Sequence, residues 1–124
     1  MKILHIEDDD SYVLLIHSLL KDINPSIQIN WVEDGKSGLT EALTGAYDLI
    51  ICDGNLPFLT GPEIVRQIRE KGITTPIIAN SANNQLNKTM IASGATKWIN
   101  KSLSAKESED RDPKEFWKIM IQSG

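Results

Sequence analysis

The chain has 124 residues, of which 40% are hydrophobic, and a formal net charge of −4 at pH 7. This length suits one domain with a single core, so we expect one domain over residues 1–124. The acidic balance, with no run of Lys or Arg, argues against a protein that binds nucleic acid through bulk charge. Direct nucleic-acid binding is therefore not expected.

Cysteine content and the N-terminal segment bear on the compartment. The single cysteine, Cys52, excludes an internal disulfide framework, and we expect it to be a small core residue. The apolar run that follows Met1 is too short for a signal peptide or a membrane span. The sequence therefore predicts a cytoplasmic chain without membrane insertion.

Short apolar runs alternate with segments of helical period along the chain. The strand candidates are 3–6, 27–32, 49–52, 76–79 and 98–99, and the helix candidates are 12–20, 36–43, 64–68, 86–92 and 113–121. The last helix has a capping Asp112 followed by Pro113. This alternation predicts right-handed βαβ crossovers and a parallel five-stranded sheet covered by helices on both faces, a three-layer α/β/α fold.

Two of the predicted strands end in carboxylates. Glu7, Asp8 and Asp9 follow the first strand, and Asp53 follows the third. If these strands are parallel neighbours, their carboxyl ends share one crevice, where open α/β sheets carry their chemistry. Two carboxylates about 4 Å apart repel by roughly 4 kcal/mol at an effective dielectric near 20, so such a cluster needs a cation or protons. Mg²⁺ suits these ligands, and the pattern indicates phosphoryl chemistry.

Four segments then occur in a set order along the chain. They are 3–9, 48–53 with Pro57 and Gly61 behind it, 76–82, and 94–95 leading to Lys101. Together they resemble the response-regulator receiver domain of two-component signalling, and the resemblance covers nearly the whole chain. It implies a flavodoxin-like doubly wound sheet with strand order 2-1-3-4-5.

The resemblance also implies roles for the acidic residues. Asp53 matches the phospho-accepting aspartate. Glu7 and Asp8 match the acidic pair that holds Mg²⁺, for which Mn²⁺ could substitute, and Asp53 and the backbone carbonyl of Asn55 complete the protein ligands. Asp9 would replace one member of the pair if the alignment is off by one residue.

Three further positions carry expected roles by the same resemblance. Ser81 matches the hydroxyl that turns toward the phosphoryl oxygens once Asp53 is modified. Lys101 matches the ammonium that pairs with Asp53 before modification and with a phosphoryl oxygen after it. Trp98 is the candidate switch aromatic, and the alternative is a Trp that only packs at the edge of the sheet.

The implied activity is self-catalysed phosphoryl transfer onto Asp53 and its slow hydrolysis, without enzymatic turnover of another substrate. The donor would be a histidine kinase or a histidine phosphotransfer protein. With no output domain in the sequence, we expect a stand-alone regulator that acts on a separate effector protein. This interpretation also allows a homodimer. The alternative is a receiver-like module that binds partners without being phosphorylated. A haloacid-dehalogenase-like phosphatase would need an acid two residues beyond a nucleophile on the first strand, whereas Asp53 ends the third strand and is followed by Gly54 and Asn55. A flavodoxin-like cofactor module would need a phosphate cradle rich in Ser, Thr and Gly after the first strand, where the carboxylates of 7–10 would repel the phosphate.

Some positions depart from the family pattern. Ser102 stands where the family usually has a proline after a cis peptide bond, which puts that geometry in doubt. The stretch 81–94 is about a turn short, so we expect a truncated or late fourth helix, and 102–112 is a long polar connection. Both changes fall on one face, so the partner contact is expected to differ from the common arrangement. His5 and His17 are expected to be structural, with no second metal ligand near His17.

Overall fold

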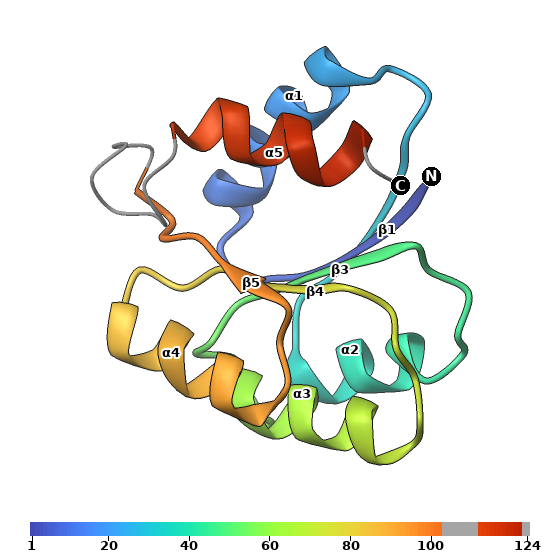
Figure 1. Cartoon of the computed structure of the whole chain (residues 1–124), viewed down its shortest axis with the longest axis vertical. Helices are drawn as coiled ribbons and strands as arrows, with labels where there is room; N and C mark the ends of the chain where they lie inside the picture. Colours follow the sequence, from blue (N-terminus) through green and yellow to red (C-terminus); the bar gives the residue numbers. More distant parts are fainter. Residues whose placement is uncertain (103–111, 123–124) are drawn as a thin grey trace.

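The computed structural model of the chain describes residues 1–102 and 112–122, and Figure 1 shows their arrangement. In chain order the elements are β1 (Lys2–Ile6), α1 (Asp10–Ile23), β2 (Gln28–Val32), α2 (Gly35–Ala42), β3 (Leu49–Cys52), α3 (Gly61–Glu70), β4 (Ile77–Ala79), α4 (Asn84–Ser93), β5 (Lys97–Trp98) and α5 (Pro113–Gln122). Each predicted strand and helix is present, and the observed ends differ from the predicted ones by a few residues. The predicted alternation is confirmed.

The strands form one parallel sheet in the order β2-β1-β3-β4-β5. The chain leaves β1 toward β2 on one side and reaches β3 on the other, so the order reverses between β1 and β3. Loops that leave in opposite directions open a crevice at the carboxyl ends of these two strands. In the register of the sheet Ile6 lies opposite Cys52, which places the next residue of each strand, Glu7 and Asp53, at this crevice. The flavodoxin-like topology is therefore confirmed.

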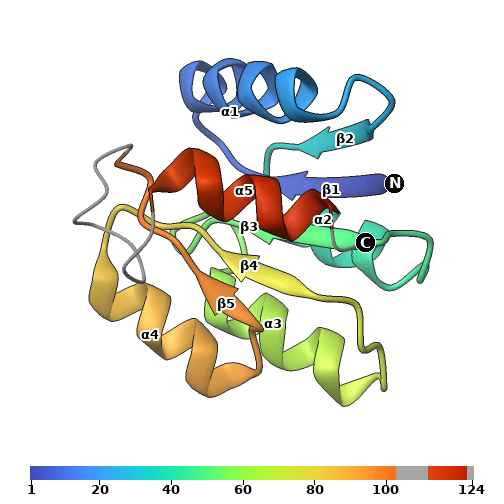
Figure 2. The same cartoon turned by 45° about the horizontal axis from the view of Figure 1, so that its top comes forward.

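Helices cover both faces of the sheet. Figures 1 and 2 show α1 and α5 on one face and α2, α3 and α4 on the other. Because side chains alternate along a strand, Leu4 and Ile6 of β1 pack toward the α2–α4 layer, while Ile3 packs toward α1 and α5. His5 shares the face of Ile3. No helix in the described part of the chain is long and apolar enough to cross a membrane.

Polar side chains begin several of the helices. Asp9, Asp34 and Asn83 are the N-cap residues of α1, α2 and α4, and each accepts a hydrogen bond from a backbone N–H of the first turn. Such caps satisfy donors that have no partner within the helix. Helix α3 instead has Pro62 in its first turn, where the missing N–H costs nothing.

The expectation of a truncated or late fourth helix is wrong. Helix α4 begins three residues after Ser81 and runs for ten residues, as many as α3. The early start follows from the cap, since the Asn83 side chain accepts from the N–H of Leu86 at 3.0 Å.

The described residues contain no cis peptide bond, so the Lys101–Ser102 peptide is trans. Most of the long connection predicted over 102–112 lies outside the described residues.

Candidate functional site

The carboxyl ends of β1 and β3 bring three carboxylates together. Oxygen atoms of Glu7, Asp8 and Asp53 lie within 4.8 Å of one another. Glu7 and Asp53 are buried, whereas Asp8 is exposed. One Asp53 oxygen, Oδ1, accepts the backbone N–H of Gly54 at 2.7 Å. The structure thus gathers the acidic groups that the sequence placed at the ends of neighbouring strands.

Lys101 brings a positive charge to this cluster. Its Nζ lies 2.7 Å from Oε2 of Glu7 and 3.2 Å from Oδ2 of Asp53. The ammonium also lies 5.2 Å from the centre of the Tyr12 ring, a cation–π contact. The backbone N–H of Lys101 donates to the carbonyl of Ser81 at 3.2 Å, which ties the chain after β5 to the chain after β4. Lys101 pairs with Asp53 in this structure, as the sequence predicts for the unmodified state.

The pKa values of Glu7, Asp53 and Lys101 depart from their ordinary values. Burial raises the pKa of Glu7 to about 7, with the hydrogen bond from Lys101 opposing the rise and the charge on Asp53 adding to it. Burial also raises the pKa of Asp53, although the Lys101 ammonium again opposes the shift. Burial alone would lower the pKa of Lys101, but its bonds to both carboxylates raise it. One ammonium therefore does not fully compensate these carboxylates.

One oxygen of the cluster is left without a partner. Oε1 of Glu7 is buried and accepts no hydrogen bond from the described residues. An unpaired buried carboxylate oxygen is costly in an apolar setting. Asp9, the alternative ligand, already uses its Oδ1 as the cap of α1, where it accepts from Ser11 and Tyr12. Glu7, Asp8 and Asp53 are therefore the oxygen donors that fit a hard divalent cation such as Mg²⁺.

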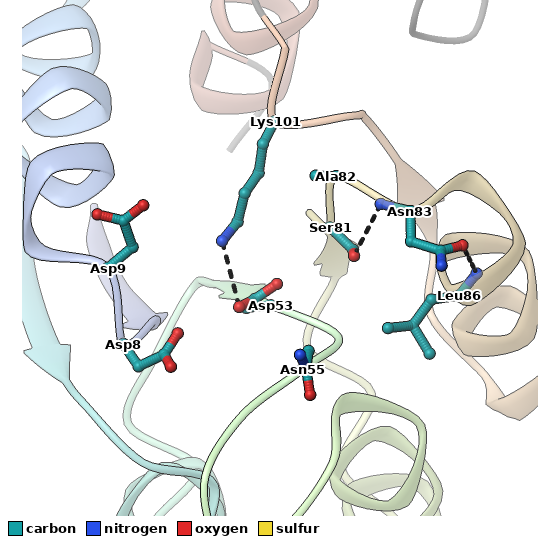
Figure 3. Close-up of a pocket in the computed structure, with 9 residues that line it drawn as sticks. All are labelled: Asp8, Asp9, Asp53, Asn55, Ser81, Ala82, Asn83, Leu86 and Lys101. Atoms are coloured by element: carbon teal, nitrogen blue, oxygen red, sulfur yellow. Dashed lines mark hydrogen bonds and ion pairs between the residues drawn. The ribbon is translucent and has the colours of Figure 1, made fainter.

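An open cavity of about 600 Å³ adjoins Asp53. In Figure 3, Asp8 and Asp9 border it on one side, Ser81 and Asn83 border the other, and Lys101 reaches toward Asp53 between them. Asn55 also lines the cavity, and the ligand role of its carbonyl oxygen stays a prediction. The space is large enough for a phosphoryl group with water around it.

Ser81 is 4% exposed, and its polar atoms are bonded. Its Oγ accepts the backbone N–H of Asn83 at 3.1 Å. Its backbone N–H donates to Oδ1 of Asn87 at 2.8 Å, and its carbonyl accepts from Nδ2 of the same side chain at 2.9 Å. The hydroxyl that the sequence singled out thus lies on the wall of the cavity beside Asp53.

Trp98 lies at the edge of the sheet, in β5. Its ring is partly buried and packs against the core cluster on the α2–α4 side. This placement suits sheet-edge packing, and the switching role of Trp98 stays a prediction.

Cys52 is fully buried, as predicted, and burial raises the pKa of its thiol.

The expectation that His17 has no potential ligand nearby is wrong. Nδ1 of His5 lies 3.0 Å from Nε2 of His17, at hydrogen-bond distance. Burial lowers the pKa of His5 to about 3, helped by the nearby His17, and burial also lowers the pKa of His17. Both rings are therefore neutral near pH 7. The contact links β1 to α1, a structural role in agreement with the prediction.

Three buried asparagines near the site were missed by sequence reasoning. Asn80 accepts from the Tyr12 hydroxyl at 2.8 Å and donates to the carbonyl of Ile99 at 2.9 Å. Asn100 donates to the carbonyl of Ala82 and to the side chain of Asn84, and accepts from the N–H of Ser102. Asn87 binds the backbone of Ser81, as described above. For Asn80 and Asn87 the signal in the sequence was the density of Asn after the fourth strand, which is equally typical of a polar loop, and Asn100 follows the fifth strand without such a signal.

A sequence model of the response regulator receiver domain matches residues 3–111. The chain therefore belongs to the response regulator receiver domain family of two-component systems. It is 41% identical over 86 residues to the transcriptional regulatory protein CiaR of Streptococcus pneumoniae, which covers 69% of this chain and 37% of CiaR. It is 36% identical over 109 residues to the transcriptional regulatory protein DltR of Streptococcus agalactiae, which covers 86% of this chain and 48% of DltR. The chain thus spans less than half the length of these two relatives.

A solved structure supports the same assignment. The receiver domain of the sensor histidine kinase PA1611 from Pseudomonas aeruginosa superposes with a TM-score of 0.79 at 25% identity, over 98% of this chain and 94% of that one. That structure has a magnesium ion coordinated in its active-site cleft. The predicted family is confirmed. Receiver domains bind Mg²⁺ in their acidic pocket, and the cluster of Glu7, Asp8 and Asp53 fits such a site.

Proposed function

We propose that this chain is a phospho-accepting signalling protein that takes a phosphoryl group onto Asp53 in a Mg²⁺-dependent reaction. One observation carries the proposal. The Nζ of Lys101 lies 2.7 Å from Glu7 and 3.2 Å from Asp53, at a cavity that Ser81 also lines. A nucleophile, a cation and a hydroxyl therefore surround one space. The donor would be the phosphohistidine of a histidine kinase or of a phosphotransfer protein.

The chemistry follows from how Asp53 is held. Its carboxylate attacks the phosphorus, the P–N bond of the phosphohistidine breaks as the new P–O bond forms, and the imidazole leaves and takes a proton from solvent. A loose transition state asks mainly for positioning and charge compensation. The Gly54 N–H orients the Asp53 carboxylate, and Lys101 compensates charge on the phosphoryl oxygens. A bound Mg²⁺ would add further charge compensation there.

The product differs from Asp53 in charge and in hydrogen bonding. Phosphorylation adds roughly −1 to −2 of charge and three acceptor oxygens. Lys101 and the hydroxyl of Ser81 are the donors that can meet these oxygens. The chain would then change its affinity for an effector protein, without turning over a separate substrate. We place this reaction in the cytoplasm.

The test is intact mass after incubation with Mg²⁺ and acetyl phosphate. We expect one added phosphoryl group, lost in Asp53→Asn and in the presence of a chelator. Asp48→Asn is a matched control, because Asp48 lies just before β3, its carboxylate accepts from the backbone N–H of Lys2, and it does not line the cavity. This variant should keep the adduct. No adduct, together with no response to beryllium fluoride, would replace the proposal with a module that binds partners without phosphorylation.

A further inference from the structure

A side chain of α4 holds both backbone polar groups of Ser81. Oδ1 of Asn87 accepts the Ser81 N–H at 2.8 Å, and Nδ2 of Asn87 donates to the Ser81 carbonyl at 2.9 Å. Asn87 is 0% exposed. Paired bonds to one residue fix its orientation as well as its distance. The backbone of Ser81 is thus bound to the first turn of α4, in addition to the connection along the chain.

Helix α4 also rests against the backbone beside Asp53. A Cβ atom placed on Gly54 would lie 2.5 Å from Cδ2 of Leu86 and 3.2 Å from Cβ of Ser81. The absence of a side chain at Gly54 therefore lets Leu86 approach the residue that follows Asp53, and Figure 3 shows Leu86 bordering the same cavity. Leu86 and Asn87, two consecutive residues of α4, thus contact the loops that follow β3 and β4.

The hydroxyl of Ser81 is much less restrained than its backbone. Turning the hydroxyl toward Asp53 breaks its bond with the N–H of Asn83. Moving the backbone of Ser81 away from α4 would break both bonds to Asn87. Each buried bond stabilises the folded chain, and leaving a buried amide unpaired costs more than the bond itself contributes. When a new group is added to Asp53, a response that keeps the Ser81 backbone bound to Asn87 therefore costs less free energy than one that separates them.

We propose that Asn87 is a positioning residue that makes α4 follow Ser81 when the state of Asp53 changes. The inference rests on the proposed function, because it needs a phosphoryl group on Asp53. Any displacement of the Ser81 backbone is then transmitted to α4 as a whole. Asn100 strengthens the start of the helix, since its Nδ2 donates to Asn84 at 2.8 Å and to the carbonyl of Ala82 at 3.0 Å.

The test is NMR of the ¹⁵N-labelled full chain with Mg²⁺, before and after addition of beryllium fluoride or acetyl phosphate. In the wild type we expect shifts of the backbone amides along α4 as far as Ser93. The side-chain amide protons of Asn87 should stay protected from exchange in both states. In Asn87→Leu we expect the shifts along α4 to be lost, while those at Ser81 remain.

Two matched variants separate coupling from general damage. Thr89→Ala removes an exposed hydroxyl of α4 that donates to the carbonyl of Gln85, and it should leave the shifts along the helix intact. Asn100→Leu also removes a buried amide, but one that does not touch Ser81, and it should keep the shifts beyond Leu86. Intact mass is measured on every sample, so that the extent of modification of Asp53 is known.

The outcomes are distinguishable. Shifts along α4 of equal size in Asn87→Leu and Thr89→Ala, at equal modification of Asp53, would overturn the coupling and leave the proposed function standing. Loss of protection of the Asn87 amide on modification of the wild type would overturn it too, and that readout holds even if Asn87→Leu does not fold. A wild-type chain that gains no phosphoryl group would overturn both proposals.

Discussion

The two sides of the site use different chemistry. On the β1–β3 side lie charged groups, Glu7 and Asp53 with Lys101 between them, and one buried oxygen of Glu7 has no partner among the described residues. On the β4–β5 side lie the neutral amides of Asn80, Asn87 and Asn100, which close their hydrogen bonds within the protein. We refer to these as the acidic half and the amide half.

The difference indicates which half responds to its surroundings. Groups of the acidic half can bind a proton or a cation and, under the proposed function, a phosphoryl group, and each of these changes their charge. Amide side chains do not titrate, so the bonds of the amide half are independent of pH and of metal. The acidic half is therefore suited to receive a signal, and the amide half is suited to pass it on with fixed geometry.

The largest expected effect comes from removing the cation of the acidic half. In Lys101→Met we expect modification by acetyl phosphate to slow by about 10²-fold or more, because a preorganised charge at the reacting group contributes on this scale. The measurement is the rate of adduct formation by intact mass. Lys97→Met, at an exposed position of β5, is the control. An unchanged rate in Lys101→Met would remove Lys101 from the reaction.

The next effect tests the amide half. Asn80→Leu leaves the Tyr12 hydroxyl and the Ile99 carbonyl without their partner, and we expect the free energy of unfolding to fall by about 1–3 kcal/mol. Chemical denaturation measures it, and a cycle with Tyr12→Phe isolates the Tyr12–Asn80 bond. We expect Mg²⁺ affinity to stay unchanged. A large loss of affinity would show that the two halves are not separable.

The acidic half should also give the metal-free protein a pH-dependent stability. The pKa of Glu7 is about 7 in the folded chain, above its ordinary value of 4.5, so the folded state binds the proton more tightly. Its contribution is present below about pH 4.5 and is lost as pH rises through about 7. We expect a slope of up to about 1.4 kcal/mol per pH unit, absent in Glu7→Gln. Added Mg²⁺ should stabilise more as pH rises, since the ligand must be deprotonated.

His5 should act in the opposite direction. Its pKa is lowered from 6.5 to about 3, so the unfolded state binds the proton more tightly. This contribution is present above about pH 6.5 and is lost as pH falls toward about 3. Unfolding of wild type, Glu7→Gln and His5→Leu across this range separates the two slopes. If His5→Leu kept the wild-type loss of stability in acid, the lowered pKa of His5 would not be its cause.

The smallest effect is expected just outside both halves, on the loop between β3 and α3. Phe58 has a φ of 70°, and the N–H of Leu59 donates to the carbonyl of Pro57 across it at 2.8 Å. A left-handed conformation costs an ordinary residue about 1–2 kcal/mol, and this side chain is 86% exposed. We therefore expect Phe58→Gly to stabilise the fold by about 0.5–1 kcal/mol after the entropic cost of glycine. Phe58→Ala keeps the Cβ and should show no such gain.

The acidic half was predictable because its signals are local. An apolar run followed directly by Glu7 or Asp53 predicts both the strand and the carboxylate at its end. The amide half was not, since whether an Asn lies in a polar loop or is buried beneath one depends on contacts between distant segments. The pair of His5 and His17 was missed for the same reason, because a strand and the following helix must pack before the rings meet. The start of α4 could have been found, since Asn83 stands three residues before Leu86 as an N-cap does.

The pairing of Ile6 with Cys52 sets the scale of the acidic half. Neighbouring strands lie about 4.8 Å apart wherever a sheet forms, because backbone hydrogen bonds fix that spacing. The separation of Glu7 and Asp53 is thus set by the backbone hydrogen bonds in the middle of the sheet. The loops that follow can lengthen, shorten or change sequence without disturbing it. New partner surfaces can therefore evolve around the rim of this protein while the distance between its two central carboxylates stays the same.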